Sequence, residues 1–216
     1  MSAAQELPSK LCKDSFAYMD DEQPKRTATR LSDPKALRAY AHPVRMKLIG
    51  ALRTRGPLTA TQAGRLLGES SGTCSFHLRQ LAKYGLVEES GGGTGREKPW
   101  RATSSLTDWD EVPETPEATA AVNLLTEAVA QRYFANLTRW LEARAAEDEE
   151  WQRAAFLGDR FMWVTADELV EIEENVLAMT DKYLERQERP ELRPPGARLV
   201  SYAHLGIPDV TPSVEP

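Results

Sequence analysis

The sequence predicts a mainly α fold with a small β-hairpin, followed by a further helical region. Apolar residues recur at helical spacing from Leu37 to Leu81, extended segments then flank a glycine-rich stretch at 91–95, and a long apolar stripe runs from Val122 to Leu141. The 216 residues are 41% hydrophobic and have a mean hydropathy of −0.51, which suits the cores of an ordinary soluble protein. We therefore expect one domain or two small ones, of the α+β class.

The first three helices are delimited by caps and breakers. Residues 1–30 are polar, mixed in charge and without a sustained period, so we expect a disordered arm there. One helix begins at Pro34 and a second at Pro43, since proline suits the first turn of a helix. Thr59 and Gln62 form a capping box, which opens a third helix.

A fourth helix and a glycine-tipped hairpin follow. The polar turn 69–72 leads to a helix over 73–84, which buries a stripe of apolar side chains. Residues 86–90 are then extended, 91–95 form a flexible turn, and 96–103 return as the second strand. The hairpin ends the first predicted domain, which begins at residue 31 and extends to residue 104.

The remainder of the chain is predicted as a linker and a second domain. Residues 105–116 are an acidic, proline-marked linker, and 117–216 are an acidic region with a long helix that ends near Glu147. Thr165 and Glu168 form a second capping box and open another helix.

Two short apolar segments in this second domain are candidates for strands. Residues 161–164 and 198–202 have the composition of extended chain, and we expect them to pair in a small two-stranded sheet.

Charge is divided unevenly between the two predicted domains. Residues 33–104 hold 12 Lys and Arg against 5 Asp and Glu, whereas residues 105–216 hold 10 against 23, so the net charge of −6 conceals a basic block beside an acidic one. The basic block favours a nucleic-acid partner, although two solvated surfaces would give the same pattern. The acidic half would then lie away from DNA, because phosphates repel it.

Several classes of protein are excluded by what the sequence lacks. No apolar run approaches the ~18 residues of a membrane span, and residues 1–26 have no secretory signal. Cys12 and Cys74 are too few for a disulfide scaffold or a four-cysteine zinc site. No nucleophile triad, phosphate-binding motif or dinucleotide fingerprint is present, so we expect no enzymatic activity and no cofactor. We expect a cytoplasmic protein that does not bind membranes.

Three helices followed by a glycine-tipped hairpin are the arrangement of a winged helix-turn-helix. The major groove of B-DNA, about 12 Å wide, admits one α-helix, and the preceding helix holds it at the right angle. Here the helix over 73–84 buries Cys74, Leu78 and Leu81 and leaves a small, polar and cationic face outward. The candidate DNA contacts, including two cations of the wing, are Ser71, Gly72, Thr73, Ser75, Phe76, Arg79, Lys83, Arg96 and Lys98.

These segments resemble a known family. ALRAYAHPVRMKLIGAL, LTATQAGRLLG and GTCSFHLRQLAKYGLVEE, followed by the glycine wing, are similar to ArsR-type winged-helix transcription factors, in particular actinobacterial-style members with an extra C-terminal domain. The resemblance covers about residues 31–104. It implies a homodimer that binds a palindromic operator, usually as a repressor relieved by an inducer. The family's DNA contacts correspond to Ser71, Gly72, Ser75, Phe76 and Arg96, although family members often have His where Phe76 stands.

The metal sites of that family do not carry over. The helix over 59–67 lacks the paired cysteines, and the helices after Pro116 contain no histidine. We therefore expect a non-metal effector. Core and dimer interface are the first explanation of the aromatic density in the C-terminal half, and a candidate effector pocket at Trp140, Phe156, Phe161 and Trp163 is the second.

Two other functions remain open from the sequence. The winged helix can serve as a protein-interaction module without DNA readout, with the acidic half as the binding surface. Alternatively, Cys74 near a helix N-terminus can act as a thiol redox sensor, which requires a depressed pKa and an exposed sulfur. Cys74 and His77 lie three residues apart and could face one another as two metal ligands. The ordinary explanation is that Cys74 packs as a small apolar side chain and that His77 forms a hydrogen bond.

Overall fold

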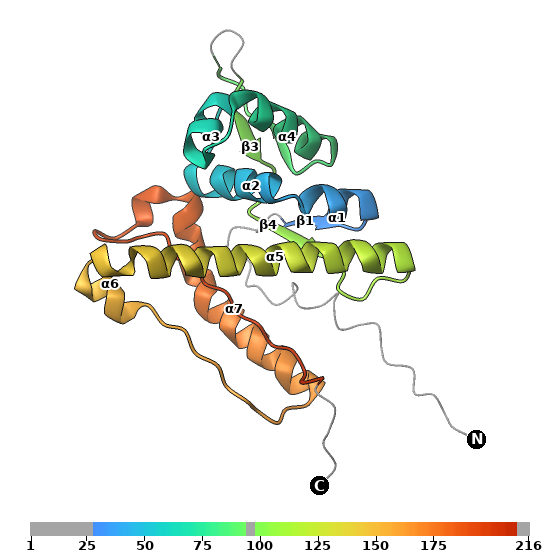
Figure 1. Ribbon diagram of the computed structural model, residues 1–216, viewed down its shortest axis with the longest axis vertical. Coiled ribbons are helices and arrows are strands. Elements are labelled where there is room, and N and C mark those ends of the chain that lie inside the picture. Colours follow the sequence, from blue (N-terminus) through green and yellow to red (C-terminus); the bar gives the residue numbers. More distant parts are fainter. Residues whose placement is uncertain (1–27, 94–97, 211–216) are drawn as a thin grey trace. The chain divides into compact units, whose positions relative to one another are not determined.

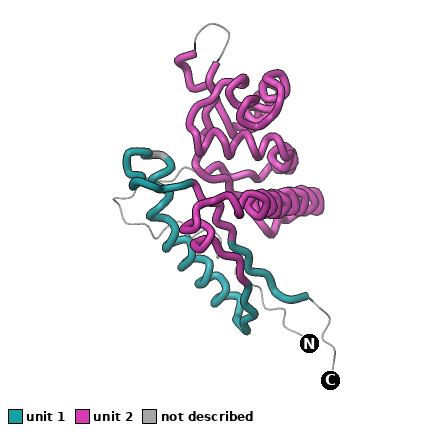
Figure 2. Tube along the Cα trace, turned by 60° about the vertical axis from the view of Figure 1, so that its left-hand side comes forward, with its two compact units in different colours: residues 1–25, 159–198, 204–216 teal, residues 26–158, 199–203 magenta. Residues whose placement is uncertain are grey.

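The computed structural model describes residues 28–93 and 98–210, and these belong to two compact units. Of the described residues, 28–93, 98–158 and 199–203 form one unit, here the winged-helix unit (unit 2 in Figure 2), and 159–198 and 204–210 form the other, here the α7 unit (unit 1 in Figure 2). The predicted arm at residues 1–27 lies outside the described residues.

Three of the first four helices of the winged-helix unit begin at the predicted caps and breakers. Their bounds are α1 Pro34–Tyr40, α2 Pro43–Arg55, α3 Ala60–Leu67 and α4 Ser71–Lys83 (Figure 1). The capping box of α3 is confirmed, because the Gln62 N–H donates to Thr59 Oγ1 at 3.2 Å and the Thr59 N–H donates to Gln62 Oε1 at 2.8 Å. Helix α4 begins two residues earlier than predicted, since the Ser70 hydroxyl caps it by accepting from the Thr73 N–H at 3.0 Å.

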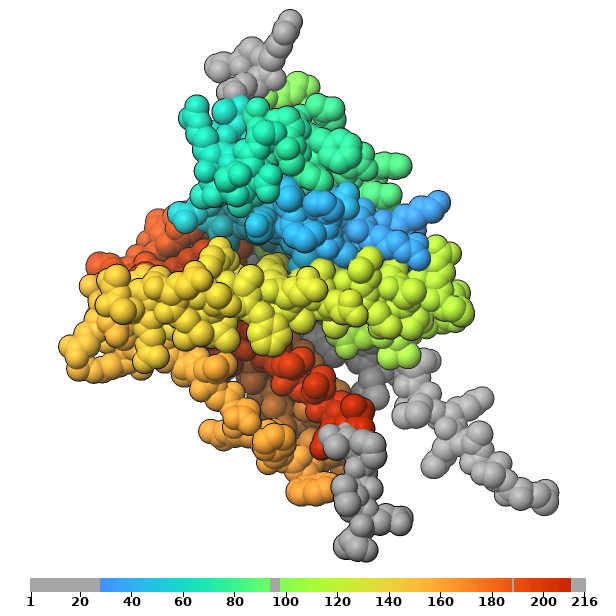
Figure 3. Space-filling view, in the orientation of Figure 1, coloured from blue at the N-terminus to red at the C-terminus, as the bar shows by residue number. Residues whose placement is uncertain are grey.

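The hydrophobic core of this unit includes the start of a long helix, α5 (Pro116–Ala143). Ala121, Val122 and Leu125 of α5 are buried with Leu37 of α1 and Leu81 of α4, and α5 lies directly against α1 (Figure 3). The structure therefore divides the chain differently from the predicted boundary at 105–116, because the apolar stripe of α5 completes the core of the preceding helices.

Within residues 28–93 and 98–210, four short strands form two small sheets. The predicted hairpin is present as β2 (Val87–Glu89) antiparallel to β3 (Trp100–Ala102). A second, parallel pair joins β1 (Ala28–Leu31) to β4 (Leu106–Trp109), where the sequence predicted the end of a disordered arm and a linker. Polar contacts distant in sequence hold this pair.

These contacts centre on Ser104, which precedes β4. The Thr29 and Ser104 hydroxyls lie 2.8 Å apart. Arg53 of α2 donates from Nε to the Ser104 carbonyl at 2.9 Å and from Nη2 to Thr107 Oγ1 at 2.8 Å. Neither contact follows from local periodicity, and strands therefore lie where the sequence predicted the end of a disordered arm and part of a linker.

The remaining segments contain helices but no strand among the described residues. In the winged-helix unit, α5 continues into η1 (Arg144–Ala146) and α6 (Glu149–Ala154); in the α7 unit, α7 (Ala166–Glu188) precedes η2 (Pro190–Leu192). The capping box of α7 is confirmed by the Glu168 N–H, which donates to Thr165 Oγ1 at 3.2 Å.

The predicted strands 161–164 and 198–202 are wrong. Neither segment has strand structure, and Phe161 and Trp163 are 93% and 105% exposed. The second segment is also divided between the two units. A strand needs a neighbour for its backbone hydrogen bonds, and apolar composition alone does not supply one.

Candidate helix-turn-helix DNA interface

Helices α3 and α4 cross closely because the crossing point is a glycine. A Cβ at Gly64 would lie 2.6 Å from the carbonyl oxygen of Glu69, which is too close for any other residue without movement of backbone. Gly68 ends α3 in the left-handed conformation with φ of 71°, and the Glu69 N–H donates to the Gly64 carbonyl at 2.9 Å. The two helices are thus fixed at one angle by a tight, specific turn.

The inner face of α4 anchors the helix in the core. Cys74, Leu78 and Leu81 are fully buried, which confirms the predicted inward stripe. His77 is also buried, at 8% exposure, and its ring lies 4.5 Å from the ring of His42 at the start of α2. The helix therefore has little freedom to rotate and present a different face.

The outer face of α4 carries the predicted contacts of that helix. Phe76 is 54% exposed, an unusual position for a phenylalanine on a solvated surface. Arg79 donates from Nη2 to Ser75 Oγ at 2.8 Å, so its guanidinium is held along the helix one turn back. The outward set, exposed or half-exposed, comprises Ser71, Gly72, Thr73, Ser75, Phe76, Arg79 and Lys83.

The wing is less basic than its sequence suggests. Lys98 pairs with Glu89 at 2.7 Å, and Arg101 pairs with Glu88 at 2.6 Å, across the β2–β3 hairpin. The sequence analysis missed these ion pairs. Pairing the two predicted strands residue by residue would have placed Glu88 opposite Arg101, as the structure does. Arg96, the other predicted wing contact, lies outside the described residues.

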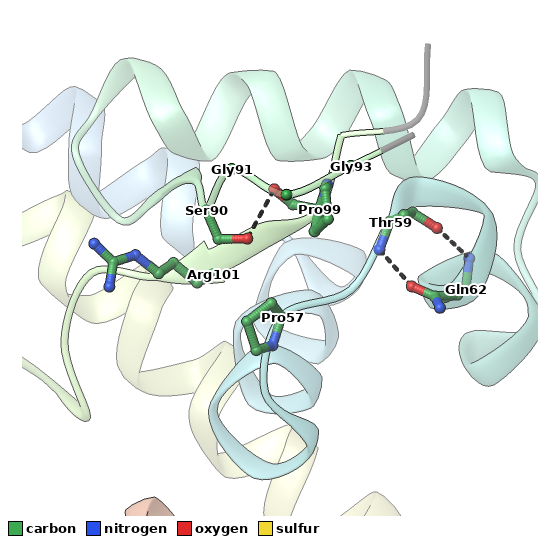
Figure 4. A pocket seen from close by; sticks show the side chains of 9 residues that line it. Pro57, Thr59, Gln62, Ser90, Gly91, Gly93, Pro99 and Arg101 are labelled. Atoms are coloured by element: carbon green, nitrogen blue, oxygen red, sulfur yellow. Dashed lines mark hydrogen bonds between the residues drawn. The ribbon is translucent and has the colours of Figure 1, made fainter. Parts of the chain in front are cut away.

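A hollow of about 640 Å³ lies between the base of the wing and the N-terminus of α3 (Figure 4). The backbone of Leu58 bonds that of Trp100 in both directions, at 3.0 and 2.8 Å, and so ties the chain before α3 to the wing. Hydroxyls, glycine backbone and a guanidinium form most of the lining, which comprises Pro57, Thr59, Gln62, Ser90, Gly91, Gly92, Gly93, Pro99 and Arg101.

Burial is the largest cause of the pKa shifts of His42, Cys74 and His77. The pKa of His42 is lowered by burial and, to a smaller extent, by the neighbouring Arg45. The pKa of His77 is lowered by burial and then by His42 and Arg45. Glu69 raises both pKa values and so opposes these shifts. Burial, with Glu69 adding to it, raises the pKa of the Cys74 thiol. Cys74 thus has neither the exposure nor the thiolate character that a redox sensor requires, and Cys12 lies outside the described residues.

The four aromatic residues of the predicted effector pocket are mostly exposed within their own units. Trp140 is half-buried, whereas Phe156, Phe161 and Trp163 are 81%, 93% and 105% exposed. Phe156 belongs to the winged-helix unit and the other two to the α7 unit. Aromatic density in the sequence indicated apolar surface but not where that surface is covered.

Comparison with known families identifies the domain. The family model of a helix-turn-helix domain matches residues 40–90, which span α2 to the first strand of the wing. No curated protein matches the chain. Within the described residues, no helix has the length and apolar character to cross a membrane, and no three His, Cys, Asp or Glu side chains cluster as metal ligands would. Residues 40–90 therefore form a helix-turn-helix domain, the module of DNA-binding transcriptional regulators.

Proposed function

We propose that this protein is a sequence-specific transcriptional repressor of the ArsR type, which binds a palindromic operator as a homodimer and is released by a non-metal effector. The outer face of α4 supports this proposal most directly, because a helix anchored by three fully buried side chains presents hydroxyls, an arginine and an exposed phenylalanine on its other side. We assign it no catalytic role.

The α4 face has the chemistry to read base edges. A guanidinium held at Ser75 suits the O6 and N7 acceptors of guanine, and the exposed ring of Phe76 suits a thymine methyl group. Ser71, Gly72 and Thr73 lie in the first turn of α4, where small residues allow close approach to the DNA backbone. Sequence specificity then depends mainly on Arg79 and Phe76.

The wing supplies contacts that are independent of sequence. Arg96 and Lys98 are proposed to contact phosphates of the adjacent minor groove. Since Lys98 is paired with Glu89, the wing contributes less to affinity than its count of cations suggests. This arrangement favours specific over non-specific binding.

A dimer is required because one helix contacts too few base pairs for a unique site. The two α4 helices would enter successive major grooves about 34 Å apart. Surfaces of α1 and α5 are the proposed contact; α5 leaves Phe134 and Leu141, seven residues apart on one face, 70% and 58% exposed. An effector would act by changing the separation of the two α4 helices.

Selection of genomic fragments by the purified protein tests the function. The expected result is enrichment of one palindromic sequence, with an affinity that falls steeply as salt concentration rises. Measurable binding without salt dependence, or no binding to any fragment, would contradict the proposal and favour the protein-interaction module. Enrichment of a single half-site without its inverted copy would retain DNA binding but reject the dimeric operator.

A further inference from the structure

Three aromatic rings form a continuous contact from the start of α2 to the outer face of α4. The ring centroid of His42, which caps α2, lies 4.5 Å from that of His77 on the inner face of α4. The ring of His77 in turn meets the ring of Phe76 edge-on, with 5.2 Å between the centroids and 70° between the planes. Because Phe76 is 54% exposed and belongs to the proposed base-reading face, this contact joins a buried histidine to a residue proposed to touch DNA.

The buried position of His77 suits a neutral ring and not a charged one. The side chain is 8% exposed, and its Nδ1 is buried without a hydrogen-bond partner among the described residues. A neutral imidazole with its proton on Nε2 has only a lone pair at Nδ1, whereas the protonated ring has an N–H at both nitrogens. Protonation would therefore create a buried, charged donor without an acceptor, at the full cost of its desolvation.

The charged and titratable groups around His77 act mostly in the same direction. From α2, His42 and Arg45 disfavour a charge on the ring of His77; from the turn before α4, Glu69 favours it. Burial is the largest effect, so the pKa of His77 lies below its ordinary value of 6.5. Cys74, one turn earlier on α4, adds no charge, because burial raises the pKa of its thiol. A proton on His77 thus favours movement of its ring away from α2.

We propose that His77 positions Phe76 for base reading and that a proton on His77 releases Phe76, so that acid weakens recognition of the operator. With His77 neutral, its ring supports the phenyl ring from the inner side of α4 and restricts it to one orientation. With His77 charged, the imidazole turns away from α2 and Phe76 loses that support. This inference rests on the proposed function, and it names the proton as a non-metal effector of the proposed repressor.

The direction of the effect separates this mechanism from general electrostatics. As pH falls, carboxylates and histidines gain protons, the protein becomes more positive, and its affinity for any DNA increases. Loss of the Phe76 contact acts in the opposite direction, and only on DNA that offers the matching base edge. The ratio of operator affinity to random-DNA affinity therefore isolates the effect, because the general electrostatic contribution cancels in that ratio.

Fluorine NMR of the full chain tests the contact without DNA. The chain is labelled with fluorophenylalanine, the Phe76 signal is assigned with Phe76→Leu, and the isotope shift between light and heavy water reports the exposure of the ring. As pH falls from about 7 to about 5, we expect Phe76 to become more exposed with the midpoint at which the His77 ring titrates, below pH 6.5. Phe134, 70% exposed on α5, is the matched control and should show no such change. A Phe76 ring whose exposure does not follow the titration of His77 would overturn the proposal.

Two variants separate the proton on His77 from the shape of its side chain. Glutamine is close to histidine in size and does not titrate, so the exposure of Phe76 should be independent of pH in His77→Gln. His42→Asn retains both the cap of α2 and the titrating His77, so the change should remain, with its midpoint at higher pH because one group that opposes the charge is gone. A response that persists in His77→Gln, or a midpoint that does not rise in His42→Asn, would overturn the proposal.

Operator binding is measured on wild type and His77→Gln at constant salt concentration. For wild type, the ratio of operator affinity to random-duplex affinity should fall by up to about tenfold for each pH unit below the His77 midpoint, the limit for one proton excluded from the bound state. For His77→Gln the ratio should stay constant. A constant ratio in wild type, or equal loss on both duplexes, would overturn the proposal. No binding to any duplex would reject the proposed function, and the fluorine measurement alone would then decide whether His77 positions Phe76.

Discussion

The winged-helix unit and the α7 unit differ in where their apolar side chains lie. In the first, residues from α1, α2, α4 and α5 meet in one core, and Leu48, Leu78 and Leu81 have no exposed surface. In the second, no described side chain is buried, and α7 presents its apolar residues to solvent. The first unit therefore has a packed core to stabilise it, whereas the described residues of the second have none.

The largest expected difference between the units is in core substitutions. Leu81→Ala should lower the free energy of unfolding by about 2–5 kcal/mol, because it opens a cavity in a fully packed core. Leu177→Ala, at a 43% exposed leucine of α7, should change it by less than about 0.5 kcal/mol. Urea unfolding followed by circular dichroism measures both, and similar losses would mean that α7 has a core of its own.

The next effect concerns the crossing of α3 and α4. Gly64→Ala should destabilise the winged-helix unit by about 1–3 kcal/mol, because the new methyl group meets the backbone oxygen of Glu69. Gly50→Ala in α2 is the matched control; nothing lies within 4 Å of its added Cβ, so a gain of up to about 1 kcal/mol is expected from helix propensity. Thermal unfolding of both variants decides this, and a neutral Gly64→Ala would show that the crossing is looser than described.

The sequence could predict features that depend on residues close together in the chain, but not features that depend on distant contacts. Caps such as Thr59 and Thr165, and the buried stripe of α4, depend on residues three or four apart, so local pattern was sufficient. The β1–β4 pair depends on Arg53 and on contacts between residues about 75 positions apart, which no local pattern reveals.

The candidate site was predictable to a similar extent. The outward face of α4 followed from its helical period, whereas the ion pairs of Lys98 and Arg101 depend on the hairpin register. The aromatic residues Phe161 and Trp163 were visible as a cluster in the sequence, but composition does not determine which surface covers them.

A third prediction separates base reading from phosphate binding. Arg79→Ala should cost about 1–3 kcal/mol on the operator and much less on random DNA, because only the operator offers the matching base edge. Arg96→Ala should weaken binding to all sequences alike and reduce the salt slope by about 1. Fluorescence anisotropy with operator and random duplexes at several salt concentrations measures both. Equal loss on the two duplexes for Arg79→Ala would contradict a base-reading role.

The smallest expected effect is a pH dependence of stability that arises from two histidines of the winged-helix unit. The lowered pKa values of His42 and His77 mean that both rings stay neutral in the folded chain while the unfolded chain already binds protons. Stability is therefore fully present above about pH 6.5 and decreases as pH falls below it. A proton on His42 Nδ1 would also remove the acceptor of the Val44 N–H, a 3.2 Å bond that caps α2.

His42→Asn tests this pH dependence with little structural change. Asparagine is a good N-cap and does not titrate, so the variant should retain the cap and lose part of the decrease in stability between pH 7 and pH 5. Burial and Arg45 still lower the pKa of His77 in this variant, and Glu69 still raises it, so the part of the decrease that is due to His77 should persist. Urea unfolding at several pH values gives the slope. An unchanged slope would show that His42 contributes nothing to the acid sensitivity, which would then arise from His77 or from groups elsewhere in the chain.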